Sequence, residues 1–220
     1  MKQQIIPTAD GSQTLFLPDM NEQYHSVNGA RTESEYVFIE KGFRFHSGPM
    51  PTVFEVGFGT GLNALLTAIV AEKDKRKTTY FTIEKYPLDE TIINQLNYGQ
   101  LVSEKARQWF GQIHACPWNV TVEINPWFFL HKLNANIITS PLTGMKLFDV
   151  VYFDAFGPDK QPEMWTPEIF RKIFNRSSAG SIFVTYSAKG EVRRQLEAAG
   201  FQMERLPGPP GKKQMLRGIK

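Results

Sequence analysis

The chain has 220 residues, of which 41% are hydrophobic and 13% aromatic, so it can bury a substantial core within one domain. Its 25 basic and 22 acidic residues give a net charge of +3, which permits a polyanionic partner without requiring one. The single Cys116 excludes an intrachain disulfide, and the four scattered histidines argue against a metal site.

The N-terminus has no apolar segment of the signal-peptide kind, and no apolar run is long enough to span a membrane. We therefore expect a cytoplasmic protein. Residues 1–220 are expected to form a single domain, in which residues 1–50, marked by irregular Gly and Pro punctuation, are a small N-terminal extension to a Rossmann-like core of residues 51–220.

From Thr52 onward, short β-rich runs alternate with longer amphipathic stretches, as in a parallel sheet with crossover helices. The pattern predicts seven strands, at residues 52–56, 79–84, 127–133, 148–153, 181–185, 201–206 and 213–219. It predicts helices at residues 62–72, 87–96, 167–174 and 190–199. Pro87 and the pair Thr166 and Pro167 are predicted to mark helix starts, with the Thr166 hydroxyl as a cap.

The last two predicted strands are joined only by residues 207–212, which leave no room for a crossover helix. Strands with so short a connection run antiparallel, so the otherwise parallel sheet is expected to end in a hairpin. This arrangement is typical of class I methyltransferases and unusual for nicotinamide-binding Rossmann domains.

Three glycines, Gly57, Gly59 and Gly61, lie between the first predicted strand and its helix. Such a loop lets the backbone approach a ligand, and the helix N-terminus behind it offers free N–H groups. The spacing G-x-G-x-G leaves little room for a pyrophosphate and fits the amino acid part of S-adenosylmethionine (SAM) better. The alternative is a tight turn that only packs the strand against the helix.

Two acids follow predicted strands at the edge where ligands of open α/β sheets gather. Glu84 is placed to accept hydrogen bonds from ribose hydroxyls, although an ordinary exposed acid is the alternative. Asp154 begins a loop rich in Pro, Gly and aromatic residues that indicates a substrate pocket. For an amine nucleophile, its carboxylate could orient the amine and accept its proton, or it could merely cap a turn.

These segments resemble the methyltransferase half of the bifunctional tRNA enzyme MnmC and its stand-alone form MnmD. The resemblance spans nearly the whole chain, and residues 154–165 are its most specific part. The other segments that carry it are residues 24–30, 35–39, 55–63, 83–88 and 192–218.

The resemblance implies an α/β class I SAM-dependent methyltransferase, with a seven-stranded Rossmann-like sheet that ends in an antiparallel hairpin. It implies methylation of the primary amine of 5-aminomethyl-2-thiouridine at tRNA wobble position 34, giving 5-methylaminomethyl-2-thiouridine. The anticodon region of tRNA would be the partner. In the bifunctional relatives an FAD-dependent oxidase domain follows, and since this chain ends at Lys220 we expect none here. The oligomeric state is not set by the sequence.

The resemblance, together with the loop chemistry, assigns roles to individual residues, and Asp154 is the expected catalytic residue. The expected SAM-binding residues are Glu55, Gly57, Phe58, Gly59, Gly61, Asn63, Glu84, Lys85, Asn136 and Asp154. The expected substrate-binding residues are Phe156, Gly157, Pro158, Lys189, Arg193, Lys212 and Lys213. Asn136 stands where the family usually has an acid; its amide oxygen can accept the same bond from adenine, or it can simply form a turn.

Basic residues near the C-terminus favour RNA as a cluster, although each one singly could be part of a solvated face. Phe156 or Trp165 could stack on an unpaired base, and core packing is the better interpretation for Trp165. Alternatives are a methyl- or aminopropyltransferase acting on a small amine and a non-catalytic SAM-binding RNA partner. A nicotinamide oxidoreductase is disfavoured by the glycine spacing and the hairpin.

Overall fold

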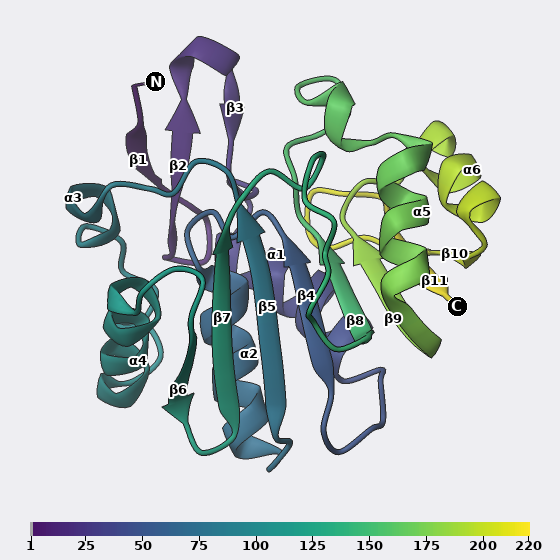
Figure 1. Cartoon of the computed structure of the whole chain (residues 1–220). Helices are drawn as coiled ribbons and strands as arrows, with labels where there is room; N and C mark the ends of the chain where they lie inside the picture. The colour runs from purple at the N-terminus through teal and green to yellow at the C-terminus, as the bar shows by residue number, and fades with distance from the viewer. Residues whose placement is uncertain (1) are drawn as a thin grey trace.

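The computed structural model describes residues 2–220, and its main feature is a mixed sheet of eight strands (Figure 1). The strands are β4 (Thr52–Val56), β5 (Thr78–Glu84), β6 (Thr121–Asn125), β7 (Phe128–Asn134), β8 (Phe148–Phe153), β9 (Ser177–Thr185), β10 (Gln202–Pro207) and β11 (Gln214–Ile219). Their order is β10-β11-β9-β8-β4-β5-β7-β6. The strands from β9 to β7 in this order run parallel, and both ends of the sheet are antiparallel.

The terminal hairpin is confirmed, because β10 and β11 pair antiparallel from Gln202 opposite Ile219 to Pro207 opposite Gln214. The prediction of seven strands is wrong by one, since β6 adds an edge strand beside β7. Its sequence Thr-Val-Glu-Ile-Asn is largely polar, and Thr121 and Glu123 are exposed. It therefore lacks the continuous apolar run that indicates the buried strands.

The helices that flank the sheet are α2 (Leu62–Lys73), α4 (Glu104–Ala115), α5 (Pro167–Arg176) and α6 (Gly190–Ala199), with short turns at α3 (Glu90–Ile93) and η3 (Pro162–Met164). Helix α4 was not predicted. The predicted start at Pro87 is wrong, because α3 begins after Asp89, whose carboxylate accepts from the Thr91 N–H at 2.8 Å. Pro167 does begin α5, but the Thr166 hydroxyl makes no capping bond.

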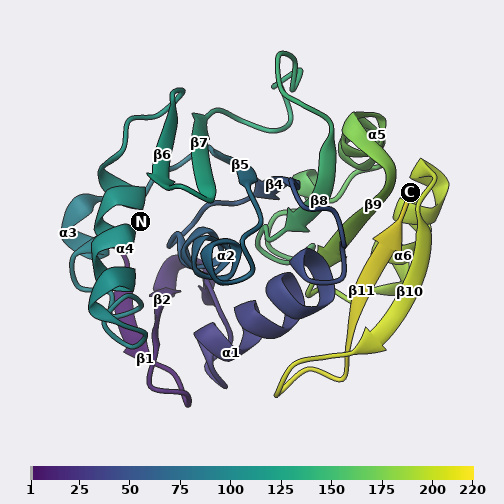
Figure 2. The same ribbon diagram turned by 90° about the horizontal axis from the view of Figure 1, so that it is seen from below.

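Two apolar layers cover the two faces of the sheet. Because successive side chains of a strand point to opposite faces, Val53 belongs to one layer and Phe54 to the other. The first layer contains α2 and α4, and the second contains α5 and α6, as Figure 2 shows from below. No helix among residues 2–220 has both the length and the apolar character needed to cross a membrane.

The N-terminal region contributes a small antiparallel sheet of β1 (Gln4–Pro7), β2 (Gln13–Leu17) and β3 (Glu22–Gln23), with the turn η1 (Pro18–Met20) between β2 and β3. Helix α1 (Ala30–Ser34) follows and continues as a π-helical segment, η2 (Glu35–Phe43). This continuous helix lies beside α2 against the sheet (Figure 2). Gly42 allows the close approach, because a Cβ there would lie 2.9 Å from Val184 of β9.

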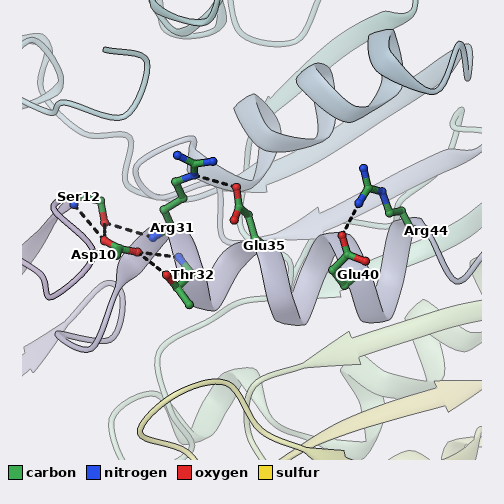
Figure 3. A network of polar contacts seen from close by, with 7 residues as sticks. All are labelled: Asp10, Ser12, Arg31, Thr32, Glu35, Glu40 and Arg44. Carbon is green, nitrogen blue, oxygen red and sulfur yellow. Dashed lines mark hydrogen bonds and ion pairs between the residues drawn. The ribbon is translucent and has the colours of Figure 1, made fainter. Parts of the chain in front are cut away.

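Figure 3 shows how the start of this helix is fixed. The Asp10 carboxylate accepts from the backbone N–H groups of Ser12 and Thr32, at 3.0 and 2.8 Å. Burial alone would raise the pKa of Asp10, but these and the hydroxyl hydrogen bonds hold it well below its usual range. The ion pairs Arg31–Glu35 and Arg44–Glu40 each join residues four apart near the two ends of the same helix, with Arg44 as its C-terminal cap. Asp10 therefore ties the loop after β1 to α1.

The side chains of η2 belong to the same apolar layer as α2 and the central strands, so we expect the N-terminal region and the core to unfold together. Phe38→Ala should lower the free energy of unfolding by about 3–5 kcal/mol, because Phe38 is 1% exposed and its ring centroid is 5.2 Å from that of Tyr152. Urea titrations followed by circular dichroism and fluorescence should give coincident single transitions. Val27→Ala, at an exposed site in the same region, is the control. A separate early transition would contradict the expectation.

Candidate functional site

A cavity of about 400 Å³ lies at the carboxyl ends of β4, β5, β7 and β8. From β4 the chain proceeds through β5 to β7 on one side and then returns to β8 on the other. This reversal of strand order opens a crevice at the edge of the sheet, where ligands of open α/β sheets bind. The volume is within the roughly 300–1,000 Å³ typical of small-molecule sites.

The glycine loop forms the floor of this cavity. Gly57 has a φ of 91°, and its N–H donates to the Ile83 carbonyl at 3.1 Å. A Cβ on Gly57 would lie 2.7 Å from the backbone oxygen of Asp154, so only glycine lets the two segments approach. Gly59 has a φ of 50° and faces the ring of Tyr24. The loop therefore contacts β5, Asp154 and the N-terminal region at once.

Glu84 fixes the far side of the loop. One carboxylate oxygen accepts from the Gly59 N–H at 3.2 Å, and the other accepts from the Tyr86 N–H at 2.8 Å. Burial raises the pKa of Glu84, and the hydrogen bonds from these backbone groups oppose that rise. Each oxygen keeps a lone pair, so the side chain that holds the loop can also accept from a ligand in the cavity.

Asp154 follows β8 directly, and its N–H donates to the Val56 carbonyl at 3.0 Å. Its Oδ2 accepts from Nδ2 of Asn63, in the first turn of α2, at 2.8 Å. Burial raises the pKa of Asp154 to about 7, with Glu33 adding to the rise and the Asn63 hydrogen bond and Lys212 opposing it. A carboxylate with a pKa near neutral is suited to accept a proton from a bound amine.

Aromatic side chains line the cavity together with Asp154. The rings of Tyr24 and Phe156 meet edge to face with centroids 5.0 Å apart, and Tyr186 donates its hydroxyl to the Ala155 carbonyl at 2.8 Å. Trp165 is 4% exposed and donates to the Phe156 carbonyl at 2.8 Å. Trp165 is thus part of the core, as the sequence favoured, and holds the loop from beneath.

The opposite wall is the turn after β7. The Asn136 side-chain oxygen accepts from the Ile138 N–H at 3.0 Å, so it forms a turn and also lines the cavity. Lys172 of α5 supports this turn, because its ammonium group donates to the carbonyls of Ile137, Ile138 and Ser140 at 2.8–2.9 Å. All three ammonium donors are therefore engaged in shaping the wall.

The structure brings about half of the expected site residues to the cavity. Those that line it are Gly57, Phe58, Gly59, Asn63, Glu84, Lys85, Asn136, Asp154 and Phe156. Those that do not line it are Glu55, Gly61, Gly157, Pro158, Lys189, Arg193, Lys212 and Lys213. Glu55 is wholly buried in β4, and Gly61 begins α2 with a φ of 72°. Among residues 2–220, no group of three or more His, Cys, Asp or Glu side chains could hold a metal ion.

The expected RNA-binding cations are partly neutralised by carboxylates. Lys189 pairs with Asp159, and Arg193 pairs with Glu197 one turn along α6 at 2.7 Å. Lys212 pairs with Glu33 at 2.6 Å, and its ammonium lies 3.8 Å from the ring centroid of Tyr186. Within residues 2–220, Lys213 and Arg194 have no carboxylate within ion-pair distance.

Sequence reasoning missed a whole wall of the cavity. This wall comes from the N-terminal region, which contributes Gln3, Leu17, Met20, Tyr24 and His25, and Tyr186 after β9 adds to it. Lys160 of the loop after β8 donates to the Met20 carbonyl at 2.7 Å and so joins the two parts. The one sequence feature that pointed to this wall is segment 24–30, which carries part of the family resemblance and includes Tyr24 and His25. It did not indicate that either side chain faces the cavity.

The chemistry of the lining fits SAM. Glu84 offers carboxylate lone pairs to hydroxyl groups of a ligand, and Asn136 lines the same cavity at the turn after β7. The loop at Gly57 and Gly59 has no side chains to exclude the amino acid part of the ligand. Asp154 lines the cavity together with the aromatic side chains of Tyr24, Phe156 and Tyr186.

The doubly wound sheet, its terminal hairpin and a G-x-G-x-G loop followed by Glu84 define a class I methyltransferase. A family model described as S-adenosyl-L-methionine-dependent methyltransferase matches residues 97–220. The chain belongs to this family.

The relatives point to one branch of it. The tRNA 5-methylaminomethyl-2-thiouridine biosynthesis bifunctional protein MnmC of Nitrosospira multiformis is 33% identical over 93% of this chain and 35% of its own length. Its counterpart in Pseudoalteromonas atlantica is 31% identical over 96% of this chain and 32% of its own length. The chain thus spans about a third of the length of these relatives.

Solved structures agree with the fold. The crystal structure of MNMC2 from Aquifex aeolicus superposes with a TM-score of 0.83 at 26% identity, covering 99% of this chain and 70% of that chain. Spermidine synthase from Thermotoga maritima gives a TM-score of 0.55 at 15% identity, covering 100% of this chain and 73% of that chain, and so shares the fold alone.

Gly57→Ala tests whether the loop must approach Asp154. The added methyl group would meet the Asp154 carbonyl, and the positive φ adds strain of about 1–3 kcal/mol. We expect SAM affinity, measured by calorimetry, to fall about tenfold or more, since each 1.4 kcal/mol is a factor of ten. Gly180→Ala is the matched control, because its φ of 74° brings similar strain into open space. Equal losses in both variants would rule out the clash as the cause.

Proposed function

We propose that this chain methylates the primary amine of 5-aminomethyl-2-thiouridine at the wobble position of tRNA, giving 5-methylaminomethyl-2-thiouridine. The observation that carries the proposal is a partly buried carboxylate, Asp154, between the glycine loop and a ring of aromatic side chains. The names of the MnmC relatives support the choice of nucleoside. The proposal places the protein with tRNA in the cytoplasm.

Bound SAM supplies an electrophilic methyl group, and the protein must present a neutral amine to it. The Asp154 carboxylate accepts a hydrogen bond from the amine, aligns its lone pair and takes its proton. Asn63 holds Asp154 in place through the 2.8 Å hydrogen bond, and Trp165 holds the loop that follows it. Tyr24, Phe156 and Tyr186 line the cavity together with Asp154, and in this proposal their rings keep water away from the reacting amine.

The rim of the cavity suits a nucleobase. Tyr86 is 62% exposed, and the ammonium of Lys85 lies 4.6 Å from its ring centroid. Phe156 is partly exposed at the end of the cavity near Asp154. We assign stacking on the unpaired wobble base to Phe156, because single-stranded RNA is commonly held by aromatic side chains.

The phosphate contacts are assigned to cations outside ion pairs. Arg194 of α6 and Arg205 of β10 are both exposed, and a Cβ placed on Gly190 would lie 3.3 and 3.7 Å from their guanidinium nitrogens. Two neighbouring guanidinium groups attract a phosphate. Lys213 in the hairpin connection adds a third exposed cation. Lys189 and Arg193 contribute less, since a carboxylate already faces each of them.

The direct test is methyl incorporation from labelled SAM into tRNA with or without the 5-aminomethyl group. The wild type should methylate only the aminomethyl tRNA, and Asp154→Asn should lower kcat by about a hundredfold or more, because an amide cannot accept the proton. Asp159→Asn, an exposed acid in the same loop, is the control and should retain activity. Transfer to a small amine but not to tRNA would overturn the proposal.

The pH dependence follows from the raised pKa of Asp154. Since only the ionised carboxylate can act as a base, kcat at saturating SAM and tRNA should rise through a pH of about 7. The residual activity of Asp154→Asn should lack that step. A step in wild type near the ordinary value of an aspartate, about pH 4, would show that the pKa of Asp154 is not raised, and a step that persists in Asp154→Asn would show that Asp154 is not the base.

Salt dependence of tRNA binding tests the phosphate contacts. Arg194→Ala should weaken binding and reduce the slope of log affinity against log salt by roughly one. Arg193→Ala, the adjacent residue on the same helix, should change the slope less because Glu197 already pairs with it. Filter-binding titrations at several salt concentrations make the comparison. Equal slopes for wild type and both variants would exclude α6 from the RNA interface.

A further inference from the structure

Glu55 is a carboxyl group without a hydrogen-bond partner in the middle of the core. Its side chain is 0% exposed, and neither Oε1 nor Oε2 takes part in a hydrogen bond with any residue of 2–220. Leaving a buried polar group unpaired is strongly unfavourable, and burying an unpaired negative charge is worse. The mechanism described above does not use this residue, and it does not line the cavity.

Three neighbouring side chains also carry a buried polar atom without a hydrogen-bond partner. Asn63 Oδ1, the Tyr80 hydroxyl and Thr82 Oγ1 are each buried and without a partner. All three side chains lie close enough to the Glu55 carboxyl group to lower its pKa, and burial outweighs them, so that the pKa is raised overall. An ionised Glu55 could accept from the two hydroxyls but could offer nothing to Asn63 Oδ1, which only accepts. A protonated Glu55 satisfies that oxygen by donating to it.

We propose that Glu55 is a positioning residue that works in its protonated form, donating its O–H to Asn63 Oδ1 so that the Asn63 amide group presents its NH₂ to Asp154. The observed bond from Asn63 Nδ2 to Asp154 Oδ2, 2.8 Å long, is the last link of this chain. The inference rests on the proposed function, in which Asp154 accepts the proton of the amine.

The direction of the Asn63 amide decides the properties of Asp154. With NH₂ toward Asp154, the hydrogen bond favours the ionised carboxylate; with Oδ1 toward it, two acceptors would repel. Burial also favours the neutral form of Glu55, whose pKa is raised to about 8. The proton on Glu55 therefore keeps Asp154 available as a base at neutral pH.

The other titratable groups that face Glu55 are few. Tyr80 approaches from β5, Tyr152 from β8, and Asp154 from the end of β8. Burial raises the pKa of both tyrosines above their usual value, so they stay neutral when Glu55 ionises. Loss of the Glu55 proton above about pH 8 would remove the donor to Asn63 and add a second negative charge beside Asp154.

The test compares Glu55→Gln with Glu55→Leu. The Gln side chain carries an NH₂ group that can donate to Asn63 permanently, so kcat and the SAM dissociation constant at pH 7 should stay within about threefold of wild type. Leu cannot donate, so kcat should fall about tenfold or more and the step assigned to Asp154 should move to higher pH. SAM binding, measured by calorimetry, should change little in either variant.

The pH profile separates positioning from mere packing. Wild-type kcat should decline above about pH 8 as Glu55 ionises, whereas Glu55→Gln should retain its rate there. Infrared difference spectra of wild type against Glu55→Gln at pH 7 should show the carbonyl band of a protonated carboxylic acid, lost at alkaline pH. If Glu55→Leu does not fold, the pH profiles and infrared spectra of wild type and Glu55→Gln still test whether Glu55 acts in its protonated form.

Three results would overturn the inference: no protonated-acid band at pH 7, an identical alkaline decline in Glu55→Gln, or weakened SAM binding in Glu55→Gln with kcat unchanged. The last would make Glu55 a SAM ligand instead. The Asp154→Asn variant distinguishes failure of this inference about Glu55 from failure of the proposed function. If that variant stays fully active, Asp154 is not the base, while the infrared band still reports whether Glu55 is protonated.

Discussion

The site depends on two backbone hydrogen bonds at the end of β4. The Gly57 N–H donates to the Ile83 carbonyl of β5, and the Asp154 N–H donates to the Val56 carbonyl of β4. These bonds continue the parallel ladders on both sides of β4 by one residue beyond the strand. They bring the glycine loop and Asp154 into contact, and a side chain on Gly57 would separate them.

Most of the arrangement of the candidate site, and the terminal hairpin of the sheet, could be predicted from local sequence patterns. Apolar strands followed by Gly57, Glu84 and Asp154 place all three at one edge, because parallel strands share their carboxyl ends. The hairpin followed from the shortness of residues 207–212. The edge strand β6 and helix α4 were not predicted, because both are largely polar. Only one face of each is buried and stabilised by packing.

The N-terminal wall of the cavity could not be predicted for a different reason. Tyr24 and His25 reach the cavity through the packing of the small sheet, and no period in the sequence encodes that contact. The same holds for ion pairs across the fold. The pairing of Lys212 with Glu33 joins residues far apart in the chain, so its consequence for the charge near Asp154 is visible only in three dimensions.

The position of β11 has a consequence for how the protein is made. It is the last strand in the chain, yet it lies between β9 and β10 in the sheet. The hairpin also contacts the N-terminal helix: the Tyr36 hydroxyl donates to the Pro207 carbonyl at the end of β10, and Lys212 in the connection before β11 pairs with Glu33. The contacts that tie the N-terminal helix to the hairpin therefore join residues made early in synthesis to residues 207–212, which are made more than 170 residues later. Until β11 has been synthesised, β9 lacks its antiparallel neighbour and presents an open sheet edge, which is a hazard for pairing with other chains.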